Sequence, residues 1–139
     1  MIPVVDDELL TLEAETQPSL TYALDAENGR IRGKVDGLEA VKQAVYLALS
    51  TERFAHLIYS WNYGAELDGF IGQPKEYVLS EIKRRISDAL LQDDRITAVD
   101  NFKFETKKNA VHVIFTVHSV FGVVKLYAFF APEKEQNCR

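Results

Sequence analysis

The last third of the chain carries three β-type runs joined by short turns. The runs cover residues 96–104, 111–117 and 123–130, and turn-forming residues separate them at 107–109 and 119–122. Because short turns join neighbouring strands that run in opposite directions, this pattern predicts an antiparallel meander. One face of such a sheet needs cover from other elements, and two helical segments earlier in the chain can supply it.

The first helical segment begins at Asp36, where Glu39 follows three positions later and the pair resembles a capping box. It should end near residues 49–51. Its apolar residues recur at spacings of three and four and so share one side of the helix: Leu38, Val41, Val45, Ala48 and Leu49.

The second helical segment begins at Gln73-Pro74, because proline suits a first helical turn, and should run to about Leu91. Glu81 can pair with Arg84 or Arg85 on its exposed side. Its predicted core face consists of Val78 or Leu79, Ile82, Ile86, Ala89 and Leu90.

A β-hairpin precedes both helices. Leu20, Tyr22 and Leu24 alternate with more polar residues, Asn28-Gly29 supplies a tight turn, and residues 31–35 return. Each strand is expected to have one apolar and one solvated face. The complete prediction is an α+β fold in the order β-β-α-α-β-β-β, an antiparallel β-sheet with two main α-helices packed on one face.

The domain organisation follows from length and charge. A chain of 139 residues with 47% hydrophobic residues fits one globular domain, which we place at 20–131. Residues 1–19 hold five acids and no Lys or Arg, and form an N-terminal arm that is either a frayed end or a segment that orders on a partner. Residues 132–139 are expected to form a flexible C-terminal tail.

Composition disfavours several classes of function. The net charge of −5 argues against nucleic acid, which needs a basic stripe. The single cysteine, Cys138, leaves neither an intramolecular disulfide nor a cysteine metal site. The N-terminus does not resemble a signal peptide, and no run of about 18 apolar residues occurs. We therefore expect an intracellular chain with no membrane contact, no metal and no other cofactor.

Catalytic constellations are not recognisable in the sequence. His112 and His118 share one side of a strand, but six residues place them about 20 Å apart, too far to share a metal. His56 stands alone, and neither a dinucleotide fingerprint nor a phosphate loop is present. The chain is therefore not expected to be an enzyme.

Carboxylates are the remaining catalytic option. Glycoside hydrolysis needs only two carboxyl groups across a cleft, so a lysozyme-like cell-wall hydrolase using Glu52 with Asp68 or Asp94 is the alternative function. Arginines follow Glu52 and Asp94 directly, and a buried Arg partner keeps a carboxylate ionised, the opposite of what a general acid needs. Glu66 and Asp93 are further acids in this region.

Residues 50–64 join the two helices and gather a Glu-Arg pair with several aromatic residues. Such a segment is either a packed corner or a docking surface. We interpret Glu52 and Arg53 as a brace that ties the end of the first helix to the corner, with Asp93 or Asp94 as further partners. Trp61 and Tyr63 are then expected to pack beneath it.

The last strand carries apolar residues on both faces, which is typical of a strand buried on both sides or covered by another subunit. A subunit contact would make the isolated protein self-associate. The candidate interface residues are Trp61, Val124, Leu126, Phe129 and Phe130.

These segments together carry a family resemblance. The chain resembles the small baseplate wedge protein of contractile phage tails in the order of three segments. These are a helix that ends in 49–53, the step Asn62-Tyr63-Gly64, and a second helix that leads into residues 93–96. Within that family the chain is most similar to the XkdS-like proteins of PBSX-type defective prophages. The resemblance covers about 38–130. It departs from the family pattern where no Gly precedes Glu52 and where Asp94 replaces a proline. The matched structural motif is Glu52, Arg53, Tyr63, Gly64, Asp94 and Arg95.

The resemblance implies a noncatalytic structural subunit of a contractile-tail baseplate. Its partners would be other baseplate and wedge proteins, and tail sheath or tube proteins, joined through sheet edges and terminal arms by strand addition. It would assemble in the cytoplasm of the bacterial host and remain in the tail of the particle. The family has also carried a lysozyme label, which the carboxylate pattern does not support. A stand-alone binding domain is the third possibility.

Overall fold

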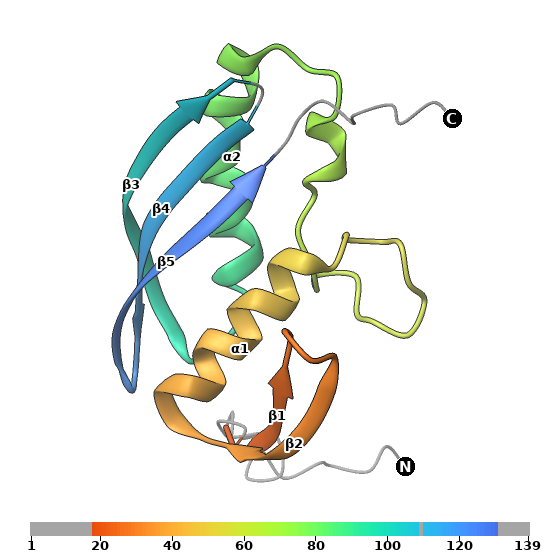
Figure 1. The fold of residues 1–139 in the computed structure, drawn as a ribbon, viewed down its shortest axis with the longest axis vertical. Helices are drawn as coiled ribbons and strands as arrows, with labels where there is room; N and C mark the ends of the chain where they lie inside the picture. Colours follow the sequence, from red (N-terminus) through yellow and green to blue (C-terminus); the bar gives the residue numbers. More distant parts are fainter. Residues whose placement is uncertain (1–17, 109, 131–139) are drawn as a thin grey trace, which may run out of the picture.

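The computed structural model describes residues 18–108 and 110–130, except for the side chain of Phe130. Most of the expected arm and the whole tail lie outside this range. The elements are β1 (Thr21–Asp25), β2 (Arg30–Val35), α1 (Gly37–Ser50), the short 3₁₀ helix η2 (Asp68–Phe70), α2 (Lys75–Leu90), β3 (Ile96–Lys107), β4 (Ala110–Ser119) and β5 (Gly122–Phe130). This order confirms the predicted α+β fold (Figure 1). The 3₁₀ helix is an addition that the sequence pattern did not predict.

Strands β3, β4 and β5 form the predicted antiparallel meander, with β4 in the centre. Alternate residues of β4 are fully buried on one face, and the helices lie on that side of the sheet (Figure 1). Phe115 at the centre stacks against Phe102 with ring centroids 5.7 Å apart. The core cluster joins both helices to the sheet through Val41, Val45, Phe70, Val78, Ile82, Ile86, Leu90, Ile96, Val111, Val113, Phe115 and Val117.

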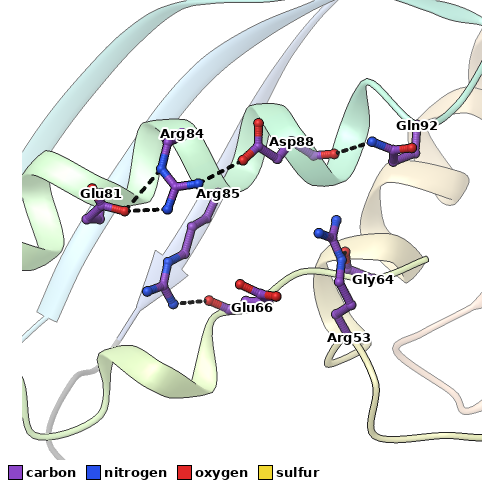
Figure 2. A network of polar contacts seen from close by, with 8 residues as sticks. All are labelled: Arg53, Gly64, Glu66, Glu81, Arg84, Arg85, Asp88 and Gln92. Atoms are coloured by element: carbon purple, nitrogen blue, oxygen red, sulfur yellow. Dashed lines mark hydrogen bonds and ion pairs between the residues drawn. The ribbon is translucent and has the colours of Figure 1, made fainter. Parts of the chain in front are cut away.

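The two helices begin and end close to the predicted positions. At the start of α1, Asp36 Oδ1 accepts hydrogen bonds from Gly37 N at 2.7 Å and from Ser19 Oγ at 2.9 Å. Glu39 pairs with Lys42 at 2.6 Å, so the described contacts show the cap without the reciprocal half of a capping box. On α2, Arg84 pairs with Glu81 at 2.6 Å and with Asp88 at 3.1 Å, as the helical spacing allows (Figure 2).

The hairpin forms a two-stranded sheet of its own, and one expectation about it is wrong. Tyr22 pairs with Lys34, but Leu24 pairs with Ile31, because the register shifts between them. Gly33 in β2 adopts a φ of 75°, a conformation that suits an irregular strand. The extra residue lies in β2, between Ile31 and Lys34, so these two side chains share a face while Tyr22 and Leu24 stay on one face of β1. The separation into an apolar and a solvated face that was expected for β2 is therefore broken.

Gln43 of α1 holds the hairpin against the helix. Its side-chain oxygen accepts a hydrogen bond from Leu24 N, and its side-chain nitrogen donates to Tyr22 O, both at 2.8 Å. The side-chain amide thus hydrogen-bonds one backbone N–H and one backbone C=O of β1, as a neighbouring strand would. This contact protects an edge that could otherwise pair with another chain.

Replacing Gln43 by alanine should loosen the hairpin without unfolding the domain. Two hydrogen bonds are lost, and we expect a loss of about 1–2 kcal/mol that is confined to residues 20–35. Hydrogen exchange at the Leu24 amide measures it directly, since this amide should exchange faster in Gln43→Ala. Unchanged protection at Leu24 would contradict the role of the side chain, and the Ile82 amide in α2 serves as the internal control.

Candidate functional site

The corner between α1 and η2 is a loop pinned at its two ends. Glu52 and Ala65 form a parallel β-bridge, in which Arg53 N donates to Ala65 O at 3.1 Å and Ala65 N donates to Thr51 O at 3.0 Å. Gly64 lies within this closure, is buried and has a φ of 95°. Residues 53–64, which lie between the two pinned ends, therefore leave and re-enter the domain at one place.

Glu52 and Arg53 brace this corner. Glu52 Oε2 accepts hydrogen bonds from the backbone N–H groups of Leu67 at 3.1 Å and Asp68 at 3.2 Å, at the start of η2. Arg53 Nε donates to Gly64 O at 3.2 Å. Figure 2 shows Arg53 beside Gly64. The expected link from the helix end to the corner is present.

A second arginine attaches the corner to α2. Arg85 Nη1 donates to Glu66 O at 2.6 Å (Figure 2). Its guanidinium also lies 4.4 Å from the centre of the Phe70 ring. This cation–π contact adds to the hydrogen bond. From its helical spacing, Arg85 was expected only as a possible surface partner of Glu81.

The expected contact from the brace to Asp93 or Asp94 is wrong in the described part of the chain. Asp93 is instead held by Arg95, which donates to it from its backbone N at 3.0 Å, from Nε at 2.9 Å and from Nη2 at 2.7 Å. Because Asp93 and Arg95 are only two residues apart, a local turn is enough to bring them together, and Arg95 occupies the Asp93 carboxylate that the brace was expected to contact. Asp94 lies exposed on the surface beside it.

Burial and pairing act on the pKa of Asp93 in opposite directions. Burial raises the pKa of this carboxyl, but the hydrogen bonds and charge of Arg95 outweigh burial and hold the pKa below its ordinary value of 3.8. The same pair raises the pKa of Arg95. Asp93 is thus ionised at neutral pH and suits a structural role more than that of an acid catalyst.

The Asp93–Arg95 pair predicts an acid-dependent loss of stability. Because the folded-state pKa of Asp93 is lowered, its contribution is present above the unfolded value near 3.8 and disappears as the pH falls through the lower folded value. Asp93→Asn should lower the free energy of unfolding by about 1–2 kcal/mol at neutral pH. Urea unfolding measured from pH 7 to pH 2.5 should show this gap closing in acid. A gap that stays constant would contradict the assignment.

The loop itself exposes large apolar side chains. The exposed fraction reaches 102% for Leu57, 86% for Ile58 and 79% for Trp61. Figure 1 shows this yellow-green segment projecting away from the helices. The expectation that Trp61 packs beneath the corner is therefore wrong, because the pinned loop carries it into solvent. Tyr63 is half-buried and packs against Tyr59, with ring centroids 4.7 Å apart and the rings tilted by 32°.

An open groove of about 700 Å³ lies beside the loop. The start of β1, α1, the loop and the end of α2 line it, and Tyr63, Asp94 and Arg95 are among the lining residues. Three residues of the sequence-predicted motif thus border one groove. The Arg95 side chain faces it while already paired with Asp93.

Of the two carboxylate pairs of the alternative function, Glu52 and Asp68 border one hollow, whereas Glu52 and Asp94 do not. Glu52 and Asp68 line a smaller hollow of about 480 Å³, while Asp94 lines the larger groove. Oε2 of Glu52 is already engaged by two backbone donors. Within residues 18–108 and 110–130, no group of three His, Cys, Asp or Glu side chains could hold a metal ion. None of the described helices is long and apolar enough to cross a membrane.

Strand β5 divides its apolar residues between two faces. Val124 is buried, and Leu126 packs against the core, so neither is available to a partner in this structure. Phe129 lies on the opposite face, is 60% exposed and contacts His112 with ring centroids 4.8 Å apart. The side chain of Phe130 lies outside the described residues. Tyr127 is 72% exposed on the open face and was not among the predicted interface residues.

The described residues form a small α+β domain with a braced apolar loop and a sheet face that carries exposed apolar side chains, features typical of assembly proteins. The chain belongs to the contractile injection system sheath initiator family, whose model matches residues 20–122. That match includes the β1–β2 hairpin, whereas the resemblance described from the sequence began only at about residue 38. Membership makes the chain a structural component of a contractile tail system.

One relative supports this assignment, and one solved structure shares the fold. The phage-like element PBSX protein XkdS of Bacillus subtilis (strain 168) is 42% identical over 131 residues, which cover 91% of this chain and 93% of that protein. The solved structure of a protein named as a tail lysozyme, from Geobacter sulfurreducens, has a TM-score of 0.58 and 13% identity. It covers 84% of this chain and 99% of its own. At that identity the likeness concerns the fold alone.

Proposed function

We propose that this chain is a noncatalytic subunit of a contractile-tail baseplate that contacts neighbouring wedge subunits and helps to organise tube and sheath assembly. The observation that carries the proposal is the pinned loop, because it presents Leu57, Ile58 and Trp61 from a closed and braced base. Exposed apolar and aromatic anchors on a rigid support lose little conformational entropy when they bind. The loop is therefore the proposed contact with a larger baseplate subunit.

The edge of β5 supports a second proposed contact. This strand of nine residues ends the order β3-β4-β5, so one row of its backbone groups has no strand partner in the described sheet. An extended arm of a sheath or tube protein, or of a second copy, could pair there, while Val123, Tyr127 and Phe129 receive its side chains. We place this binding first in the host cytoplasm and then in the assembled tail.

The lysozyme-like alternative has one favourable observation, which is that Glu52 and Asp68 line the same hollow. The Glu52 carboxylate, however, already fixes the start of η2, because it accepts a hydrogen bond from the Asp68 N–H. This structural use disfavours a catalytic role. Peptidoglycan turnover by wild type, Glu52→Gln and Asp68→Asn distinguishes the two functions. We expect none of the three to exceed a buffer control. Turnover by the wild type that both variants abolish would overturn the noncatalytic proposal.

Co-expression with the baseplate proteins of the same tail system tests the assembly function. We expect the chain to copurify with at least one large baseplate subunit and to be incorporated into particles. A chain lacking this role would elute alone under all salt conditions while remaining folded by circular dichroism. Analytical ultracentrifugation of the isolated protein tests self-association separately. A clean monomer at high concentration would show that a second copy of the chain is not the partner of β5.

A further inference from the structure

The hollow of about 480 Å³ lies between the corner and the end of β5, on the helix side of the sheet. Leu49 of α1, Val78 of α2 and Phe129 of β5 all line it, and none of its lining residues comes from β3 or β4. Figure 1 shows β5 as the strand of the meander on the side of the corner. A segment that pairs with the free edge of β5 would therefore direct alternate side chains toward the hollow.

The hollow combines apolar walls with two acids. Glu52 and Asp68 are its acidic lining residues, His56 is the other titratable one, and neither a lysine nor an arginine lines it. Its large apolar lining residues are Leu49, Leu67, Phe70, Ile71, Val78 and Phe129. The hollow is thus complementary to a side chain that carries a positive charge at the end of an apolar stem.

Both carboxylates can accept further hydrogen bonds. Glu52 Oε2 accepts from two backbone N–H groups, whereas Oε1 has no donor among the described residues. Asp68 is exposed, and neither acid forms an ion pair within residues 18–108 and 110–130. Arg53 and Arg85 lie close to the corner, but they donate to backbone carbonyl oxygens instead. The negative charge of the hollow is therefore left for a group from outside.

We propose that the hollow binds an arginine side chain of the segment that pairs with β5, an inference that rests on the proposed β5 contact. The methylene stem lies along the apolar walls, and the guanidinium donates to Glu52 Oε1 and to the Asp68 carboxylate. Arginine suits this place better than lysine, because its guanidinium is more weakly hydrated and has several donors in a fixed arrangement. Backbone pairing along β5 supplies affinity, and the hollow selects the segment and its register.

The full-length chain alone allows a direct test with n-butylguanidinium, which reproduces the end of an arginine side chain. Two-dimensional amide NMR should show saturable shifts at the Leu67 and Asp68 amides, because both donate to Glu52 at the edge of the hollow. The neutral isostere n-butylurea has the same stem without the charge, and it should bind several-fold more weakly. Absence of saturable shifts at these amides, or equal binding of the two probes, would overturn the proposal.

Two matched variants identify the carboxylate. Asp68→Asn removes one charge but keeps the backbone N–H that donates to Glu52, so the corner should stay folded while n-butylguanidinium binds several-fold more weakly. Asp94→Asn removes the same charge from an exposed acid that lines the other groove, and it should bind the probe as the wild type does. Equal weakening in both variants would attribute the binding to net charge and overturn the assignment to the hollow.

The same chemistry can be followed in the assembly, separately from the proposed function. Where the wild type copurifies with a baseplate, sheath or tube protein through β5, Asp68→Lys should lower the yield several-fold with unchanged melting. An equal yield would overturn the use of the hollow and leave the assembly function intact. Charge-dependent binding of n-butylguanidinium without any copurification would instead support the hollow and contradict the assembly function.

Discussion

Replacing Gly64 by alanine is expected to lower the free energy of unfolding by about 4 kcal/mol. A Cβ at this position would lie 2.7 Å from the backbone oxygen of Thr51 and 3.1 Å from Arg53 N. Both atoms belong to the backbone of the corner closure and cannot move without breaking it. The φ of 95° adds strain for any residue with a side chain.

Gly72 provides a matched control for this substitution. Its φ of 78° is similarly positive, but no heavy atom lies within 4 Å of the position its Cβ would take. Gly72→Ala should therefore show the backbone term alone, about 1 kcal/mol. Urea unfolding of both variants measures the difference, and equal losses would show that the corner accommodates a methyl group. The Gly64 variant should also lose incorporation into particles, because the base of the loop opens.

The sequence predicted those parts of the fold that depend on periodic patterns. Val78, Ile82 and Ile86 recur on one side of α2 and are fully buried, and the alternating residues of β4 line the opposite side of the core. These patterns recur over at least ten residues in each element, so one irregular position does not change the conclusion. The place of the hairpin turn was equally clear, but the turn spans residues 26–29 and only Gly29 has a positive φ, so the predicted tight Asn28-Gly29 turn is wrong in its length.

The features that the sequence did not predict depend on single distant contacts. The register shift at Gly33 breaks the alternation of β2, and nothing in the sequence pattern of β2 indicates it. Gln43 hydrogen-bonds the backbone of β1 as a neighbouring strand would, and its partners Leu24 and Tyr22 are 19 and 21 positions away in the sequence. For the candidate site, the Glu-Arg brace followed from adjacency, but the exposure of Trp61 did not. An aromatic residue favours burial on average, and only the pinned geometry of the loop shows that this one projects outward.

A Leu57→Asp, Ile58→Asp double substitution is expected to weaken binding to the baseplate partner by about 100-fold, roughly 3 kcal/mol. Both side chains are fully or almost fully exposed in the free protein, so the substitutions remove no internal packing. The melting temperature should consequently stay within about 2 °C of the wild type. Binding affinity measured with the copurified baseplate subunit and incorporation into particles should both fall.

Val120→Asp with Phe121→Asp is the control for added charge on an apolar surface. These residues form the β4–β5 turn and are 61% and 47% exposed, so the chemical change is similar but falls outside the loop. An equal loss of binding in both double variants would attribute the effect to net charge and remove the loop as the docking element. If only the 57–58 variant loses binding and its melting temperature is unchanged, the loop is the docking element. The brace at Glu52, Arg53 and Gly64 then serves to hold this loop in its binding position. Damage to the brace and damage to the loop tip should then give the same assembly defect, and only the brace variants should also lose stability.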